Sequence, residues 1–160
     1  MGVIPGLGRP RPLADGDDLG SFESGVAVVD SWARARARSA VRNRTACVFV
    51  VTKGREVVGL YSLSTHSVAR VPEVVGRLRR NAPDPIPCTL LGMLGVAREW
   101  QGRGLGTSLL RDAYLRALDA ASSVASRALV VDPADEAAEA FYRHFGFLEL
   151  GIGDRMYLRF

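Results

Sequence analysis

The segment Gln101-Gly102-Arg103-Gly104-Leu105-Gly106-Thr107 follows a nearly continuous apolar run and opens a stretch with helical spacing. The apolar run, from Cys88 to Val96, is typical of a central strand. The three glycines let the backbone approach a ligand closely, and consecutive N–H groups can then point at one anion. The helix N-terminus adds a partial positive charge, and Arg103 adds a charged donor. A strand, a glycine loop and a helix in this order indicate a site for a pyrophosphate.

The spacing of the glycines separates this loop from two common phosphate loops. Gly102, Gly104 and Gly106 do not fit the G-x-G-x-x-G fingerprint of dinucleotide-binding folds. The Gly-Lys-Ser/Thr sequence of a Walker A loop is absent. A glycine-rich connection that binds no ligand is the alternative interpretation.

Strands and helices alternate on both sides of the loop. The patterns predict helices from Asp30 or Ser31 to about Arg44, from Pro72, from about Gly104 to Ala121 and from Asp132 to Gly146, with strands over 46–51, 57–64, 88–96, 127–131 and 155–160. In the long helix, we expect Leu109, Leu110, Ala113 and Ala117 to face inward. We expect residues 1–12 to be loose and 81–87 to form an extended loop, because each proline disfavours helix before it. The fold class is therefore α/β, in a single domain over residues 1–160.

Composition excludes several classes of protein. In 160 residues, no apolar run approaches the roughly 20 residues that cross a bilayer, and the first residues lack the pattern of a signal peptide. We therefore expect a cytoplasmic location. Cys47 and Cys88 lie in apolar runs, so we expect buried free thiols, and the cysteines and histidines have no metal-ligand spacing. We expect no metal.

The net charge of +4 points to an anionic partner. Lys53 is the only lysine, and arginines gather over 34–44 and 70–80. The candidate phosphate-binding residues beside the proline-rich loop are Arg77, Arg79, Arg80 and Asn81. The alternative is that these arginines are simply solvated.

Gln101-x-x-Gly104-x-Gly106 resembles the acetyl-CoA loop of GNAT N-acetyltransferases. The resemblance implies the GNAT fold, in which a mixed, mostly antiparallel central sheet is flanked by helices and its central strands splay around acetyl-CoA. It implies that backbone amides from Arg103 to Thr107 hold the pyrophosphate of this co-substrate, and that the end of the preceding strand pairs with its pantetheine arm. The implied cofactor-binding residues are Leu94, Gly95, Val96, Gln101, Gly102, Arg103, Gly104, Leu105, Gly106, Thr107 and Phe141.

The resemblance also suggests how acetyl transfer would proceed. In GNAT enzymes, the tyrosine that matches Tyr142 lies near the thioester sulfur, so Tyr142 would protonate the departing thiolate as general acid. The N–H of Val96 is our candidate donor to the charged oxygen of the transition state. The alternative is that Tyr142 only packs under the sheet, but we place it at the edge of the helix's apolar stripe. No general base stands out, although His66 and Glu99 are possible. An α-amine, with a pKa near ~7.7–8.0, needs none.

The resemblance extends over nearly the whole chain to the GNAT toxins of type II toxin–antitoxin modules. It rests on the segments Arg11-Pro12-Leu13, Phe22-Glu23-Ser24-Gly25, Val29-Asp30-Ser31-Trp32, Arg79-Arg80-Asn81-Ala82-Pro83-Asp84-Pro85-Ile86-Pro87 and the stretch from Trp100 to Ala113. The implied acceptor is the α-amino group of aminoacyl-tRNA, and the implied partner is a ribbon-helix-helix antitoxin. We also expect a homodimer.

This chain departs from the toxin pattern at several places, which include Ala33, where leucine is frequent, and Asp132-Pro133, which is unusual before the final helix. Met93 stands where an arginine is frequent, Gly95 where alanine is frequent, and Ser24 where cysteine is frequent. These departures leave two alternatives. One is a housekeeping GNAT acting on a small amine or a protein N-terminus. The other is a regulatory or DNA-binding subunit acting with an antitoxin.

Overall fold

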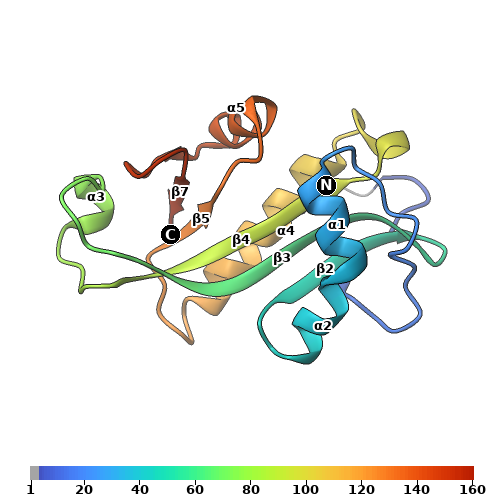
Figure 1. The fold of residues 1–160 in the computed structure, drawn as a ribbon, viewed down its shortest axis with the longest axis horizontal. Coiled ribbons are helices and arrows are strands. Elements are labelled where there is room, and N and C mark those ends of the chain that lie inside the picture. Colours follow the sequence, from blue (N-terminus) through green and yellow to red (C-terminus); the bar gives the residue numbers. More distant parts are fainter. Residues whose placement is uncertain (1–3) are drawn as a thin grey trace. The chain divides into compact units, whose positions relative to one another are not determined.

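The computed structural model describes residues 4–160. The chain forms two compact units. The first unit runs up to Leu63 and adds Met93–Ala113, and the second comprises Ser64–Gly92 and Tyr114–Phe160. The elements, in chain order, are β1 (Arg11–Pro12), α1 (Ala27–Ala35), α2 (Ala37–Arg42), β2 (Cys47–Lys53), β3 (Glu56–Val68), α3 (Gly76–Arg79), β4 (Ile86–Val96), the 3-10 helix η1 (Arg98–Trp100), α4 (Leu105–Ala120), β5 (Ala128–Val131), α5 (Glu136–Phe145), β6 (Leu148–Glu149) and β7 (Met156–Arg159) (Figure 1).

The strands hydrogen-bond in the order β1-β2-β3-β4-β5-β7-β6. β4 and β5 are parallel, whereas β2 pairs with β1 and β3, and β7 with β5 and β6, in antiparallel fashion. The predicted mixed, mostly antiparallel sheet with flanking helices is confirmed. The pairing of β4 with β5 covers Thr89–Leu91, while β4 itself continues to Val96.

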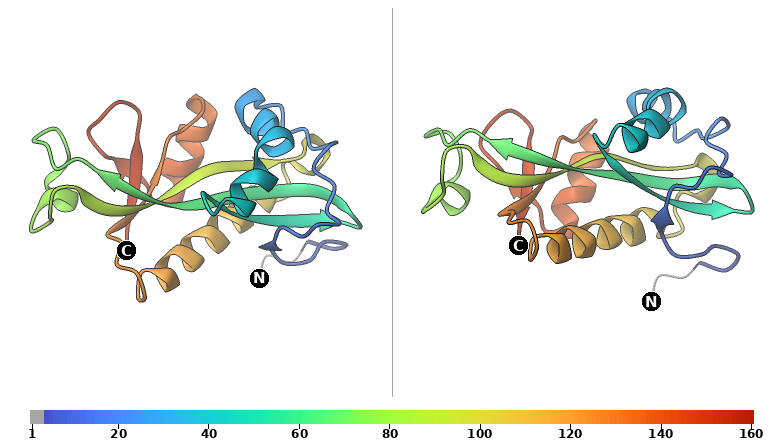
Figure 2. Two further views of the ribbon diagram at one scale, coloured as in Figure 1. Left: turned by 60° about the horizontal axis from the view of Figure 1, so that its bottom comes forward. Right: turned by 90° about the horizontal axis from the view of Figure 1, so that it is seen from below.

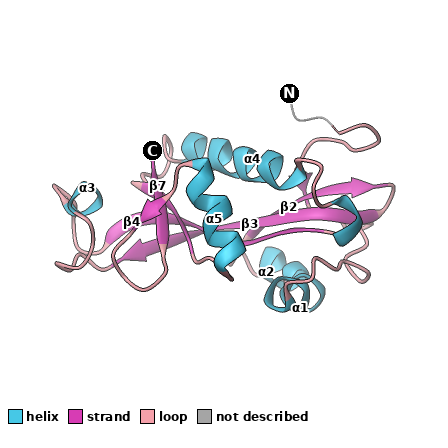
Figure 3. Ribbon diagram, turned by 90° about the horizontal axis from the view of Figure 1, so that it is seen from above, coloured by secondary structure: helices cyan, strands magenta, loops and turns pink. Residues whose placement is uncertain are grey.

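In the first unit, α1 and α2 cover one face of β2 and β3, and the beginning of α4 covers the other (Figures 2 and 3). Gly59 of β3 allows α4 to pack this closely, because a Cβ at this position would lie 3.0 Å from Leu109 Cδ1. The periodicity of α4 correctly predicted its inner face. Its four expected inward residues, Leu109, Leu110, Ala113 and Ala117, are all buried.

The core of the second unit gathers apolar residues from β3, α3 and the segment before it, β4, β5, the turn before β7 and β7 itself, namely Val68, Val74, Leu78, Ile86, Cys88, Ala128, Val130, Leu150 and Tyr157. The turn before β7 packs against the segment before α3. The N–H of Val75 donates to Leu150 O over 3.0 Å. Gly151, at φ +109°, is required there because a Cβ would overlap the carbonyl oxygen of Glu73.

The helix predicted from Asp30 or Ser31 to Arg44 begins earlier and is interrupted. The carboxylate of Asp30 does not cap it. Instead, this carboxylate accepts hydrogen bonds from Ser24 N, Ser24 Oγ and Gly25 N, so the turn before α1 is fixed and the helix starts at Ala27. Non-helical backbone at Arg36 (φ −124°) separates α1 from α2.

Asp132 does not cap the helix that carries the aromatic residues, as we had expected. Its carboxylate binds Arg155, and Asp135 caps α5 by accepting from Ala138 N over 2.8 Å. The predicted end of this helix at Gly146 is confirmed, with φ +120°.

Other boundaries shifted as well. The short helix expected at Pro72 begins at Gly76, β3 extends to Val68, and the predicted 81–87 loop passes into β4 at Ile86. Two short strands, β1 and β6, were missed because two residues give no periodicity. Of the 1–12 segment expected to be loose, Arg11–Pro12 form β1, and residues 1–3 lie outside the described residues.

Cys88 is buried as expected, and burial raises the pKa of its thiol to about 11. Cys47, at the first position of β2, is exposed, and that expectation was wrong. Within residues 4–160 no helix is long and apolar enough to cross a membrane, and no cluster of side chains suited to a metal ion occurs.

Candidate functional site

The glycine loop has a backbone conformation that favours glycine at two positions. Gly102 and Gly104 have φ values of +75° and +84°, which glycine adopts without strain. A Cβ at either position would meet nothing within 4 Å, so backbone conformation rather than crowding favours glycine. The N–H of Ser108 donates to Gly104 O over 3.1 Å and so opens the hydrogen bonding of α4. The N–H groups from Leu105 to Thr107 therefore have no acceptor within the helix.

Gln101 holds this loop in place. Its Nε2 donates to Val96 O over 2.9 Å and to Ser24 O over 2.8 Å. One amide group thus ties the end of β4 to the turn before α1. The side chain was expected to bind a cofactor, and both hydrogens of its amide are taken up by protein carbonyls.

The end of β4 is packed closely on one face. A Cβ on Gly95 would lie 2.8 Å from Val29 Cγ1 and 3.2 Å from Phe22 Cζ, so α1 and the chain before it leave no room for alanine. Because side chains alternate along a strand, Leu94 and Val96 face the opposite side. Pairing of this stretch with a pantetheine arm, and the oxyanion role of Val96, remain predictions.

Trp100, which sequence reasoning missed, lies beside the loop. Only 8% of its surface is exposed. The guanidinium carbon of Arg103 lies 4.6 Å from the centroid of the indole, and Nζ of Lys53 lies 5.4 Å from it. The position of this tryptophan immediately before Gln101 was the available signal.

In the second unit, α5 carries Tyr142. Its ring is 5.5 Å from that of Phe141 and 5.4 Å from that of Phe147. We had placed Tyr142 at the edge of the apolar stripe, and this was wrong. Tyr142 is 7% exposed and is the buried aromatic residue of the helix, while Phe141 and Phe145 are half-buried. Burial raises the pKa of its hydroxyl, which keeps the phenol protonated, as a proton donor must be.

His66 is part of an ionic cluster in the same unit. Arg155 donates to both carboxylate oxygens of Asp132, at 2.7 and 2.8 Å, and its Nη1 lies 2.8 Å from His66 Nε2. Arginine can only donate, so His66 Nε2 is the acceptor and the ring proton sits on Nδ1. Burial and Arg155 both lower the pKa of His66. Because Nε2 is engaged, His66 is a poor candidate for the general base.

Comparison with known proteins places these features in a family. An acetyltransferase (GNAT) domain matches residues 44–149, which include the glycine loop and Tyr142. The chain belongs to the GNAT acetyltransferase family.

One relative in sequence and two similar structures are toxins. This GNAT chain is 44% identical to the "tRNA-acetylating toxin" of Mycobacterium tuberculosis (strain ATCC 25618 / H37Rv), over 97% of this chain and 92% of that protein. The structure of AtaT complexed with acetyl-methionyl-tRNAfMet shares the fold, with a TM-score of 0.85, 24% identity and coverage of 96% and 94% of the two chains. A tyrosine-to-phenylalanine mutant of AtaT, bound to the C-terminus of the antitoxin AtaR and to acetyl-CoA, gives a TM-score of 0.80, 25% identity and coverage of 96% and 92%.

The α3 region of this GNAT chain concentrates positive charge. Five consecutive backbone carbonyls, from Arg77 to Asn81, accept hydrogen bonds from arginine side chains. Arg159 binds the carbonyl of residue 77, Arg70 that of residue 79, and Arg127 those of residues 78, 80 and 81. The guanidinium groups thereby neutralise the negative end of α3, and their charge adds to that of the helix's own arginines.

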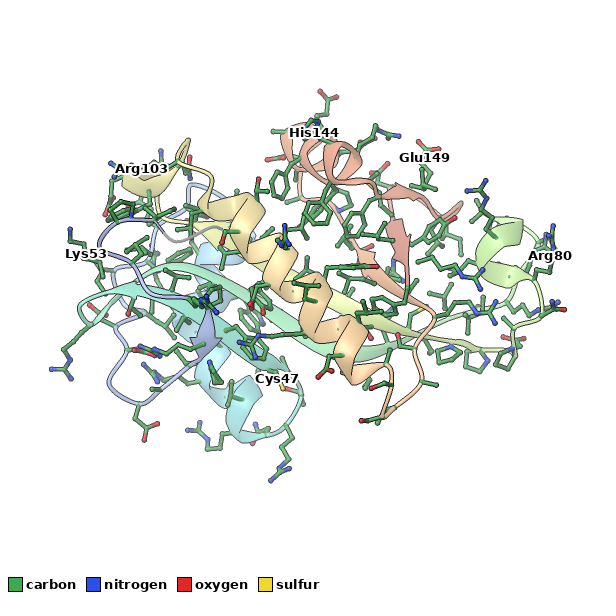
Figure 4. The ribbon with its side chains drawn as sticks, turned by 180° about the vertical axis from the view of Figure 1, so that it is seen from behind. Cys47, Lys53, Arg80, Arg103, His144 and Glu149 are labelled. Carbon is green, nitrogen blue, oxygen red and sulfur yellow. The ribbon has the colours of Figure 1, made fainter. Side chains whose placement is uncertain are left out.

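The predicted phosphate-binding residues are not equivalent. Arg77 and Arg80 are exposed, and Arg80 lies at the tip of the α3 region in Figure 4. Arg79 is half-buried, and its Nε donates to Val74 O over 3.1 Å. Asn81 is exposed and has a φ of +58°. The structure brings all four together but leaves Arg77 and Arg80 as the two arginines directed to solvent.

The arginines between residues 34 and 44, in and beside α1 and α2, also divide into two groups. Arg34 donates to Phe22 O, and Arg38 donates to Ala14 O and Asp17 O, so these two fasten the N-terminal segment to the helices. The solvated group consists of Arg36, Arg42 and Arg44.

Proposed function

We propose that this chain is an acetyl-CoA-dependent N-acetyltransferase that acetylates the α-amino group of aminoacyl-tRNA and so blocks translation. The observation that carries the proposal is its 44% identity, over 97% of the chain, to a protein named as a tRNA-acetylating toxin. The glycine loop supports the acetyl-CoA half of the proposal. Gly102 and Gly104 have positive φ values, and the N–H groups at the start of α4 lack helical acceptors.

In the proposed reaction, the amine attacks the acetyl carbonyl, a C–N bond forms and the C–S bond breaks. The N–H of Val96 stabilises the oxygen that becomes negative, and the hydroxyl of Tyr142 protonates the departing thiolate. The proton that the amine loses passes to solvent water, and Tyr142 regains a proton from the solvent. An α-amino group titrates near ~7.7–8.0, so part of it is already neutral at physiological pH. The engagement of His66 Nε2 by Arg155 fits a reaction that needs no protein base.

The α3 region supports a polyanionic acceptor. Arg77 of α3 and Arg80, which directly follows this helix, are exposed, and three further guanidinium groups bind the backbone carbonyls from residue 77 to residue 81. Such a surface attracts phosphates and releases their counterions on binding.

We further propose a cytoplasmic location, a homodimer, and an antitoxin of the ribbon-helix-helix class as partner. The complex of AtaT with the C-terminus of AtaR supports the antitoxin.

The test is transfer of labelled acetyl groups by the purified protein. Aminoacyl-tRNA, deacylated tRNA, polyamines and peptides are offered in parallel. We expect label on aminoacyl-tRNA alone. Label on polyamines or peptides, with none on aminoacyl-tRNA, would identify a housekeeping acetyltransferase. Label on deacylated tRNA would contradict an α-amine acceptor.

A further inference from the structure

Lys53 and Arg103 come from different parts of the first unit but lie over the same indole. Lys53 ends β2, and Arg103 belongs to the glycine loop. Both lie at one end of the unit in Figure 4. Their charged groups are 5.4 and 4.6 Å from the centroid of Trp100, within the range of a cation–π contact. Because Trp100 is almost fully buried, it provides a fixed support for two long side chains.

Neither cation is neutralised by a carboxylate. Among the ion pairs of the described residues, none involves Lys53 or Arg103. Glu56 pairs with Lys53 across the β2–β3 turn in the strand register without forming a salt bridge. Two like charges held over one ring repel each other, and an anion that contacts both would remove this repulsion.

The position of the pair identifies the anion. Arg103 lies directly before the N–H groups that face the pyrophosphate in the proposed site. Beyond its pyrophosphate, coenzyme A carries a phosphate monoester on the 3′ oxygen of its ribose. A monoester has a second pKa near ~6 and therefore carries about −1.5 to −2 charges at neutral pH. The forked guanidinium and the compact ammonium are both suited to bind such a group.

We propose that Lys53 and Arg103, supported by Trp100, bind the 3′-phosphate of coenzyme A and select acetyl-CoA over its 3′-dephospho form. The proposal rests on the function proposed above and adds a specificity site to it. Lys53 thus gains a role in binding the 3′-phosphate, and Trp100 a role in supporting the two cations.

Calorimetry with two ligands tests the proposal. Affinities for acetyl-CoA and 3′-dephospho-acetyl-CoA are measured for the wild type, Lys53→Ala, Lys53→Arg and Arg111→Ala. Arg111 is an exposed arginine of α4 and serves as the matched control. We expect Lys53→Ala to weaken the affinity for acetyl-CoA about tenfold, which is the size of one charge-assisted contact. The affinity for 3′-dephospho-acetyl-CoA should change less than about twofold. Lys53→Arg should restore most of the preference, and Arg111→Ala should retain all of it.

The outcomes separate the two proposals. If acetyl-CoA does not bind the wild type, the proposed function itself fails. If acetyl-CoA binds but Lys53→Ala weakens the affinities for both ligands equally, or for neither, only the proposed 3′-phosphate site is contradicted. If Lys53→Ala raises the KM for aminoacyl-tRNA alone, the two cations contact the tRNA and the proposal is overturned.

A second measurement uses the fact that Lys53 is the only lysine in the chain. Mild reductive methylation, read by mass spectrometry of the peptide containing Lys53, reports the accessibility of its amine. Saturating acetyl-CoA should protect Lys53, whereas saturating 3′-dephospho-acetyl-CoA should not. Equal methylation of Lys53 with the two ligands would overturn the assignment.

Discussion

Gly95→Ala should destabilise the protein because the end of β4 lies against α1. The added Cβ would lie 2.8 Å from Val29 Cγ1 and 3.2 Å from Phe22 Cζ, whereas ordinary contact begins at 3.4 Å. Val29 and Phe22 are buried and cannot move into solvent. Overpacking of this kind typically costs about 1–3 kcal/mol. For a chain of this length, the melting temperature should fall by roughly 2–12 °C.

The same substitution in a Val29→Ala background isolates the clash. There the atom nearest to the new Cβ is gone, and replacing glycine by alanine restricts the unfolded chain, which stabilises by about 0.4–1 kcal/mol. We therefore expect Gly95→Ala to be close to neutral in that background. The coupling between the two positions should exceed about 1 kcal/mol.

Urea denaturation of the four proteins, followed by circular dichroism, measures this coupling. Val29→Ala alone is the control for the cavity that it creates. If Gly95→Ala destabilises equally in both backgrounds, contact with α1 is not the reason that glycine stands at this position.

Three further predictions concern the reaction and its pH dependence. Tyr142→Phe should lower kcat by about 100-fold while acetyl-CoA affinity by calorimetry changes less than twofold, because a general acid acts only as the thiolate leaves; unchanged kcat would exclude this role. Arg77→Glu with Arg80→Glu should raise the KM for aminoacyl-tRNA at least tenfold and flatten its salt dependence by about two phosphate contacts, with acetyl-CoA affinity unchanged as the control; an unaltered salt slope would contradict it. The pKa of His66 is lowered in the folded state, so the unfolded chain binds more protons below about pH 6.5, and the free energy of unfolding should fall as the pH drops through this value. His66→Gln keeps an acceptor for Arg155 and should reduce this loss in denaturation curves between about pH 7 and 5.5; an identical loss in both proteins would assign it to other groups.

The features that sequence analysis predicted correctly are those set by neighbouring residues. The inner face of α4 depends on spacing within a few turns, and it is confirmed. The positive φ values of Gly102 and Gly104 agree with a glycine loop before this helix, while its binding of a pyrophosphate stays a prediction. The strand from Cys88 to Val96 was recognised because it is apolar on both faces. Gly146 ends α5 because a positive φ is a local requirement.

The features that were missed depend on distant partners. Asp132 and Asp135 are equally good caps in sequence, and Arg155, 23 residues beyond Asp132, decides between them. Asp30 looks like a cap until its carboxylate is seen to hold Ser24. Tyr142 was misplaced because burial of α5 depends on how the whole helix packs.

The arginine contacts of α3 and the cation–π contacts with Trp100 were also missed because their partners are distant in sequence. The side chain of Arg127 reaches carbonyls 46 to 49 residues earlier in the chain. Lys53 contacts Trp100 although β3 and β4 lie between the two residues in sequence. Neither contact leaves a periodic signal.

The most direct test of the central claim is the mass of the 3′-terminal aminoacyl-adenosine. Aminoacyl-tRNA is incubated with acetyl-CoA and the purified protein, digested with nuclease and analysed by mass spectrometry. Gly104→Asp serves as the inactive control, because its carboxylate would repel the pyrophosphate. We predict that the wild type adds one acetyl group to the α-amine of the aminoacyl-adenosine and that Gly104→Asp adds none. Unmodified aminoacyl-adenosine, from a wild-type protein that binds acetyl-CoA and acetylates other amines, would contradict the account.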